Sequence, residues 1–377
     1  MRFCNFSIRT AIIVLTVAGS VLLHATPAAA QSSGFLYVAT NQPAGNTVIQ
    51  YSYAADGSLT RIAELPTGGL GGTGNGIGNL APLGSQDSLI LDSTGTLLLV
   101  VNAGSNQLSS LSAGRSGLHL LNTVASGGRF PNSVAMFGNL VYVLNAQGTP
   151  NISGFRLDAN RQLQPIAGST FALPGGAAAQ PHDIGFSPDG TRLLVTEGGT
   201  NQIDIFHLGD DGLVSDVVTQ ASAGSGPFGF RFDRGVLLNA EANSASLSSY
   251  LLNSDDTLRV ISGALPDSQR AACCLTLSGS GKYAFLSNPA AASISSYEIA
   301  RDGTLLLYHP IAASLIDGAP IDSARSNGGT FMSDVGYLYV EDSAFGRIVI
   351  FRIVGASLTP SGSVSGLPRT LEGIAAK

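Results

Sequence analysis

His182 is the residue of this sequence best suited to proton transfer, because a neutral imidazole can accept and return a proton near neutral pH. It lies in the stretch QPHDIGFSPDG, which begins at residue 180. The alternative role is a structural hydrogen bond that ties its segment to a neighbouring one. A carboxylate partner would complete an acid–base pair, and Glu241 is the candidate for that partner.

Glu197 and Glu241 each end a run of apolar residues, at a position where five similar segments carry Asn or Asp. A short Asn or Asp side chain can satisfy the backbone of a turn. A glutamate reaches further, which suggests a ligand or an ion pair, so we predict that Glu197 contacts a ligand and that Glu241 assists His182. The alternative for both glutamates is a tolerated surface acid.

The stretch GGLGGTGNGIGN, residues 68–79, contains the Gly-x-Gly-x-x-Gly spacing of a dinucleotide-binding turn. That turn requires a strand before it and a helix after it. Here the following segment, SLILDSTG, has the pattern of a strand. We therefore interpret residues 68–79 as a flexible or closely packed loop, and we expect no nucleotide and no other cofactor.

Cys273 and Cys274 are adjacent, so in an exported protein they form either a strained vicinal disulfide or two buried thiols. Ordinary disulfide geometry needs a larger Cα separation than adjacent residues give, which favours the thiols. A vicinal ring stacked on a quinone has less support, because no cluster of cations accompanies the pair. His119, His207 and His309 are scattered without the spacing of metal ligands, so we expect no metal site.

The first thirty residues have the pattern of a secretory signal peptide. Arg2 and Arg9 supply positive charge, residues 11–23 are apolar, and TPAAAQ offers a small-residue cleavage site after Ala30. We expect a secreted or periplasmic protein with no membrane span, because no later segment is continuously apolar. Without residues 1–30 the chain keeps 17 of its 19 basic side chains and all 25 acidic ones, and this negative balance disfavours nucleic acid as a partner.

Seven similar units follow one another along the chain, each with an apolar strand that ends in a polar residue, a short loop and an alternating strand. The polar residues are 43 to 61 positions apart, a period typical of a four-stranded propeller blade. They are Asn41, Asn102, Asn145, Glu197, Glu241, Asn288 and Asp342. The units predict an all-β fold, namely one seven-bladed β-propeller over residues 31–377, with four strands, a to d, in each blade.

The first unit lacks its innermost strand, because FLYVAT at 35–40 follows directly after the predicted signal peptide. The segment LEGIAA at 371–376 resembles the innermost strands of the other units. We predict that this C-terminal strand completes the first blade and closes the ring, which removes the exposed edges of an open array.

In such a ring the b-to-c and d-to-a connections gather on one face, which we call the top face. The innermost strands begin there around a central channel, and aligning them predicts two rings of residues at its mouth. The first ring is Asp87, Asn132, His182, Phe228, Cys273, Ile321 and Glu372, and the second is Ser88, Ser133, Asp183, Gly229, Cys274, Asp322 and Gly373. From these rings we predict ligand contacts by Asp87, Asn132, Asp183, Phe228, Cys273, Asp322 and Glu372. Adjacent strand residues point to opposite sides, so His182 and Asp183 should not form a pair.

The stretch PHDIGFSPDGTRLLVTEGGTNQIDIF, together with NAGSNQLSSL and LVYVLNAQGTPNISGF, resembles the secreted branch of the lactonase-type seven-bladed propellers. That family includes 6-phosphogluconolactonase and the carboxymuconate lactonizing enzyme. The resemblance implies a small lactone as substrate, with His182 and Glu241 at the positions of a catalytic His and Glu. Two arginines of the family site are replaced here by Phe228 and Pro289, and Arg231 should face the other side of its strand from Phe228.

Two functions of different classes are compatible with these residues. The first is a lactonase-like or cycloisomerase-like enzyme that acts on an uncharged or weakly charged small molecule at the central top-face pocket. The second is a non-catalytic binding or scaffold propeller of the cell envelope, for a protein, a glycan or a small ligand. Loss of both arginines favours the second function. In either case we expect a monomer.

Overall fold

The computed structural model of the protein describes Met1 and residues 33–74, 80–326 and 333–377. The chain divides into two compact units, residues 1–31 and residues 32–377. Apart from Met1, the predicted signal peptide lies outside the described residues. In the described part of the chain, no helix is long and apolar enough to cross a membrane.

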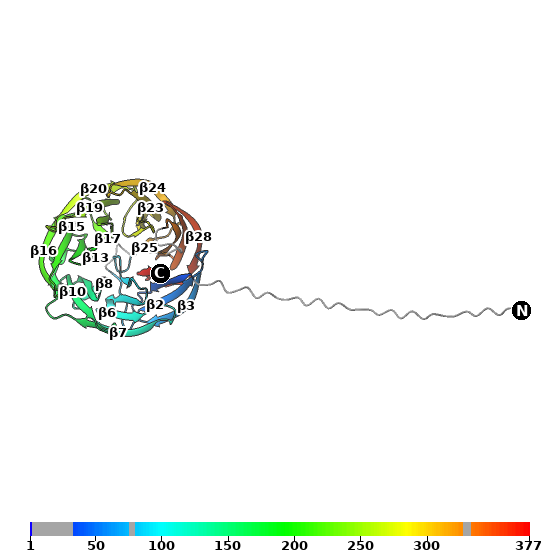
Figure 1. The fold of residues 1–377 in the computed structure, drawn as a ribbon, viewed down its shortest axis with the longest axis horizontal. Coiled ribbons are helices and arrows are strands. Elements are labelled where there is room, and N and C mark those ends of the chain that lie inside the picture. The colour runs from blue at the N-terminus through cyan, green and yellow to red at the C-terminus, as the bar shows by residue number, and fades with distance from the viewer. Residues whose placement is uncertain (2–32, 75–79, 327–332) are drawn as a thin grey trace. The chain divides into compact units, whose positions relative to one another are not determined.

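Seven antiparallel sheets are arranged in a ring, which confirms the predicted seven-bladed β-propeller (Figure 1). From the centre outward, blade 1 contains β29 (Ile374–Ala376), β1 (Gly34–Ala39), β2 (Thr47–Tyr53) and β3 (Leu59–Pro66), and blade 2 contains β4 (Leu89–Leu91), β5 (Leu97–Asn102), β6 (Gln107–Ser112) and β7 (His119–Ala125). Blade 3 contains β8 (Arg129–Phe137), β9 (Leu140–Gln147), β10 (Asn151–Leu157) and an outer strand in two pieces, β11 (Leu163–Pro165) and β12 (Phe171–Ala172). Blade 4 contains β13 (Pro181–Phe186), β14 (Arg192–Glu197), β15 (Gln202–Leu208) and β16 (Val214–Ala221).

Blades 5 to 7 follow the same order. They contain β17 (Pro227–Asp233), β18 (Val236–Glu241), β19 (Ser246–Leu252) and β20 (Leu258–Pro266); β21 (Leu275–Leu277), β22 (Tyr283–Asn288), β23 (Ser293–Ile299) and β24 (Leu305–Ser314); and β25 (Pro320–Arg325), β26 (Val335–Asp342), β27 (Arg347–Val354) and β28 (Ser357–Ser365). Among the described residues, three short 3-10 helices lie in connections of the top face: η1 (Ala103–Ser105), η2 (Gly176–Ala178) and η3 (Pro289–Ala291).

The ring closes through its C-terminal strand, as the sequence predicts. Strand β29 pairs antiparallel with β1, with Ile374 opposite Val38 and Ala375 opposite Tyr37. In Figure 1 the C-terminus lies beside the blue strands of blade 1. Because the first and last strands of the ring share one sheet, the innermost strands surround the central channel on all sides.

The turn between the two inner strands of blade 4 determines which end of the innermost strand lies at the top face. In the SPDGT turn between β13 and β14, Asp189 accepts hydrogen bonds from the N–H and hydroxyl of Thr191 at 3.1 and 2.8 Å. Gly190 in this turn has a φ of 73°, a conformation that glycine adopts readily because it has no Cβ. The turn lies at the opposite face, so His182, at the other end of β13, lies at the channel mouth.

Apolar packing between neighbouring blades holds the ring together. Between blades 3 and 4, one buried cluster includes Tyr142, Leu144, Ile184, Val195 and Phe206. Full burial of each large apolar side chain stabilises a fold by about 1.5–3 kcal/mol. Because both faces of each sheet pack in this way, the inner strands and the side chains that they carry into the channel have fixed positions.

Candidate functional site

The centre of the channel is occupied by residues 83–87, which we call the axial segment. The Leu83 and Ser85 N–H groups donate to the Glu372 carboxylate of blade 1 at 2.6 and 2.9 Å. The Gln86 N–H donates to the His182 carbonyl of blade 4 at 3.2 Å, and the Gln86 side-chain carbonyl accepts the N–H of Leu275 in blade 6 at 2.9 Å. Since these blades lie around the whole ring, the axial segment crosses the channel axis.

The axial segment follows the glycine-rich loop along the chain and is closely packed. Leu83, Ser85 and Gln86 are all buried, and the Ser85 hydroxyl donates to the Asn132 carbonyl at 2.6 Å. Residues 75–79 of the loop lie outside the described residues. Residues 68–74 form no regular strand or helix, and a strand, β4, follows the loop at residue 89. The loop therefore lacks the strand–turn–helix context of a dinucleotide site.

His182 lies at the channel mouth, half-buried, with its ring fixed on two sides. Its Nδ1 is 2.6 Å from the carbonyl oxygen of Gly84, and its ring stacks on Phe228 with centroids 4.0 Å apart and planes at 16°. Burial lowers the pKa of His182 to about 4, so the ring is neutral at pH 7.

The hydrogen bond to Gly84 assigns the tautomer of His182. A carbonyl oxygen only accepts, so Nδ1 carries the proton and Nε2 keeps a lone pair. No hydrogen-bond partner of Nε2 occurs among the described residues. His182 can therefore hold the axial segment through Nδ1 and still accept a proton at Nε2.

Glu241 is fully buried, and its carboxylate is saturated by its own blade and the connection before it. Its Oε1 accepts the Ser222 hydroxyl at 2.9 Å and the Gly224 N–H at 2.8 Å, while its Oε2 accepts the Ser246 hydroxyl at 2.7 Å. No hydrogen bond joins Glu241 to His182 in the described part of the chain. The contacts therefore do not assemble the acid–base pair that the sequence suggests.

Glu197 occupies the same place in blade 4. Its carboxylate accepts the Gly175 N–H at 3.0 Å and the Thr200 hydroxyl. A Cβ at Gly175 or Gly224 would collide with the carboxylate of Glu197 or Glu241. Because glycine has no side chain, each glutamate carboxylate can lie against the backbone of the preceding connection. This explains why a longer side chain fits at these two positions.

The same position in three other blades also binds the connection that precedes the blade. Asn102 accepts the Thr67 hydroxyl at 2.6 Å, Asn145 donates to the Ser126 carbonyl at 3.1 Å, and Asp342 accepts the Ala319 N–H at 2.8 Å. In five blades, therefore, the polar residue that ends strand b acts as a latch on the preceding d-to-a connection. This repeated contact supports a structural role for Glu197 and Glu241.

Arg231 faces the channel, contrary to the expectation from strand phase. Its guanidinium binds both carboxylate oxygens of Asp87, at 2.6 and 2.8 Å, and one of its nitrogens lies 3.9 Å from Asp183. The register of β17 shifts between Pro227 and Phe230. This irregularity changes the alternation, so Phe228 and Arg231 both reach the channel side despite their odd separation.

The other predicted ligand contacts are also used inside the protein. Asn132 is buried and donates to the Pro181 carbonyl at 2.9 Å. Asp183 accepts the Ser133 hydroxyl and the Phe230 N–H, both at 3.0 Å. Their roles as ligand contacts are not tested by these bonds and stay predictions.

Acidic groups gather around the single Arg231 guanidinium. Burial, reinforced by Asp87, raises the pKa of Asp322 to about 7, although Arg231 opposes this rise. Burial raises the pKa of Glu372 to about 8 against the N–H groups of the axial segment, and burial likewise raises the pKa of Asp183. The channel therefore holds protons near neutral pH.

Cys273 and Cys274 are free thiols, both buried, and they form a small cluster with Phe228. Neither His182 nor Glu241 lines any of four cavities that the described residues form. One of them, of about 340 Å³, is lined by Asp87 and Arg231 on the far side of the axial segment.

Comparison with known proteins gives the family. The model of the lactonase, seven-bladed β-propeller family matches residues 77–305. The chain belongs to this lactonase family. No curated protein sequence matches it.

Solved structures agree with the lactonase fold. A candidate 6-phosphogluconolactonase from Bacteroides fragilis superposes with a TM-score of 0.72 at 20% identity, covering 92% of this chain and 99% of the other. A periplasmic gluconolactonase from Pseudomonas aeruginosa superposes with a TM-score of 0.69 at 18% identity, covering 90% and 98%. A protein from Lactobacillus plantarum gives a TM-score of 0.70 at 18% identity, covering 92% and 99%. At these identities the likeness concerns the fold.

The two positions where the lactonase family resemblance implies arginines carry no charge. Phe228 is buried against His182, and Pro289 is buried as the first residue of η3. Sequence reasoning identified His182 but missed Gly84 and Gln86, which fix it from the axial segment. The 61-residue spacing of the first two units was a weak indication of the axial segment, because the residues inserted there must lie somewhere in the ring.

Proposed function

We propose that this lactonase-family chain binds and hydrolyses small uncharged lactones at the top-face mouth, with His182 as general base. The observation that carries the proposal is the fixed tautomer of His182, which leaves the Nε2 lone pair available in a half-buried site. A histidine held by a carbonyl at one nitrogen and free at the other is the arrangement that proton abstraction requires. Family membership supports a lactone as the substrate.

In this proposal Nε2 removes a proton from water, and the oxygen of that water forms a bond to the lactone carbonyl carbon. The ring C–O bond then breaks, the departing oxygen takes the proton back from the imidazolium, and the product is an open hydroxy acid. Phe228 and Pro289 offer no charge to hold an anionic substituent, so an uncharged lactone is the preferred substrate.

The second candidate is a non-catalytic, monomeric binding propeller of the cell envelope, for a protein, a glycan or a small ligand. The saturation of the Glu241 carboxylate favours it, because this group has no capacity left to serve as a partner of His182. The two candidates differ in whether turnover accompanies binding.

The test is the initial rate of δ-valerolactone hydrolysis by the native chain and by His182→Ala. His119→Ala is the matched control, because His119 is exposed on β7, outside the channel. We expect native and His119→Ala rates above the uncatalysed background and a His182→Ala rate at background. Equal rates for His182→Ala and the native chain would exclude the base, and a native rate at background would leave the binding candidate.

We also propose that the protein is exported after cleavage following Ala30, as the pattern of residues 1–30 indicates. N-terminal sequencing of protein recovered from the periplasm or the medium should begin at Gln31. Recovery of an intact N-terminus with the cells would contradict export.

A further inference from the structure

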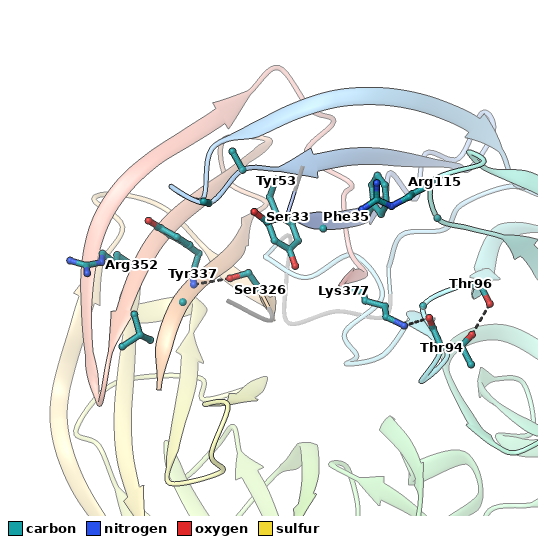
Figure 2. A pocket seen from close by; sticks show the side chains of 17 residues that line it. Ser33, Phe35, Tyr53, Thr94, Thr96, Arg115, Ser326, Tyr337, Arg352 and Lys377 are labelled. Atoms are coloured by element: carbon teal, nitrogen blue, oxygen red, sulfur yellow. Dashed lines mark hydrogen bonds between the residues drawn. The ribbon is translucent and has the colours of Figure 1, made fainter. Parts of the chain in front are cut away.

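A large cavity lies on the bottom face, opposite the His182 mouth, where blades 7, 1 and 2 meet (Figure 2). Its volume is about 800 Å³. Ligand sites in proteins commonly enclose roughly 300–1,000 Å³. The start of β1, the start of β26, strand β27 and three turns between strands form its walls. The cavity therefore has the size of a metabolite site and is independent of the proposed lactone site.

The charged side chains that line this cavity are all cationic. Arg115, Arg352 and Lys377 line it, and none of the described residues that line it is an aspartate or a glutamate. Within the described part of the chain, neither Arg115 nor Arg352 forms an ion pair. The main-chain oxygen of Lys377 that accepts the Phe35 N–H at 2.7 Å belongs to the terminal carboxylate, so three cationic side chains outnumber one anionic group at this cavity. Uncompensated guanidinium groups favour an anionic ligand.

Lys377 is held in place at the cavity wall. Its Nζ donates to the Thr94 carbonyl, as the dashed line in Figure 2 marks. A Cβ at Gly95 would collide with the Lys377 side chain, and a Cβ at Gly34 would collide with the Lys377 carbonyl oxygen. Gly95 also has a φ of 70°. The ammonium group thus occupies a defined place because two glycines leave room for the C-terminal residue.

Aromatic side chains supply the rest of the recognition surface. Phe35, Tyr53 and Tyr337 line the cavity, and Figure 2 shows Tyr53 and Tyr337 between Arg352 and Arg115. Tyr53 packs against Tyr339 with ring centroids 5.8 Å apart, which fixes its plane. Rigid aromatic rings bind planar apolar groups by stacking or edge contacts.

We propose that this bottom-face cavity binds a small aromatic carboxylate, with its carboxylate held by the cationic side chains and its ring against the tyrosines. Charged groups alone would suit any anion, and rings alone would suit any planar molecule. The combination in one site selects ligands that carry both features. The inference does not depend on lactone turnover at the opposite face.

Isothermal titration calorimetry of the full-length chain tests the proposal, with 4-hydroxybenzoate as probe and 4-hydroxybenzamide as its uncharged counterpart. We expect the benzoate to bind about tenfold more tightly than the amide, a difference of ~1.4 kcal/mol. Arg115→Gln and Arg352→Gln should each weaken benzoate binding by roughly three- to tenfold. Arg259→Gln is the matched control, because Arg259 is an exposed arginine on β20 of blade 5, and its affinity should equal that of the native chain.

Three results would overturn the proposal: no binding of the benzoate at millimolar concentration, equal affinity for the benzoate and the amide, or equal effects of all three arginine substitutions. A double variant, Arg115→Gln with Arg352→Gln, should keep the native unfolding midpoint, because neither side chain has an acidic partner in the described residues. Loss of binding together with an unchanged midpoint separates recognition from folding.

Discussion

Arg231 of blade 5 donates hydrogen bonds of 2.6 and 2.8 Å to both carboxylate oxygens of Asp87, which precedes the first strand of blade 2. Asp87 is the last residue of the axial segment, so this ion pair joins blade 5 to the centre of the channel. It also supplies the only cation that the described contacts place beside Asp183. The pair therefore balances acidic groups that the fold draws toward one axis.

Removal of the Arg231 guanidinium should destabilise the ring. Arg231→Gln leaves Asp87 and the buried Asp183 without their cation. Breaking a fully buried pair costs about 3–5 kcal/mol, and the cost here should be smaller because the Arg231 and Asp87 side chains are 30% and 23% exposed. Urea unfolding of the variant measures this loss. Arg234→Gln, which removes a more exposed guanidinium from its pair with Asp233, should cost less than about 1 kcal/mol. Equal midpoints for the two variants would contradict the role assigned to Arg231.

Asp322 should make the fold less stable as the pH rises. Its pKa in the fold is about 7, above the value of about 3.9 in an unfolded chain, so the folded state binds the proton more tightly. Its stabilising contribution is complete below pH 4 and is lost as the pH rises towards 7. In Asp322→Asn the urea midpoint should therefore fall less between pH 4.5 and pH 8 than in the native chain. Asp210→Asn, on an exposed turn, should follow the native curve.

Glu241 should matter for stability and not for chemistry. Glu241→Gln replaces one acceptor oxygen by an NH2 donor, so that Ser222 and Gly224, or else Ser246, lose their acceptor, at a cost of about 1–3 kcal/mol. Lactone turnover per folded molecule should stay at the native value below the unfolding transition. A large fall in kcat for protein that circular dichroism shows to be folded would restore the catalytic role that the sequence suggests.

The pH dependence of turnover should report His182. Its pKa of about 4 keeps Nε2 unprotonated throughout the neutral range, so kcat/KM for δ-valerolactone should be level above about pH 5.5 and decline toward pH 4. A half-maximal rate near pH 6.5, the ordinary value for histidine, would mean that the ring is solvated in the working enzyme.

Local patterns were sufficient to predict the blades and the closure of the ring. The apolar strands, the Asp-Gly turns and the orphan segment LEGIAA each act within one blade, and β29 pairs with β1 as expected. The position of His182 at the channel mouth followed from the same alignment. These features depend on neighbours in the chain or in the adjacent strand, which periodicity describes.

Contacts across the ring could not be predicted in this way. Gln86 of the axial segment contacts blades 4 and 6, and the next residue, Asp87, has a φ of 61°; no residue pattern in the sequence predicts this course of the chain. The orientation of Arg231 depends on a register shift in β17 that alternation alone does not reveal. The latch function of Glu241 depends on the absence of a Cβ at Gly224, which is 17 residues away.

The hydrogen bond from His182 to Gly84 is the central element of the proposed site, and nitrogen NMR of the native chain tests it most directly. The account predicts a neutral His182 ring at pH 7, with the proton on Nδ1, an unprotonated Nε2 and a titration midpoint near pH 4. A ring that carries its proton on Nε2 at pH 7, or that becomes charged near pH 6.5, would contradict it.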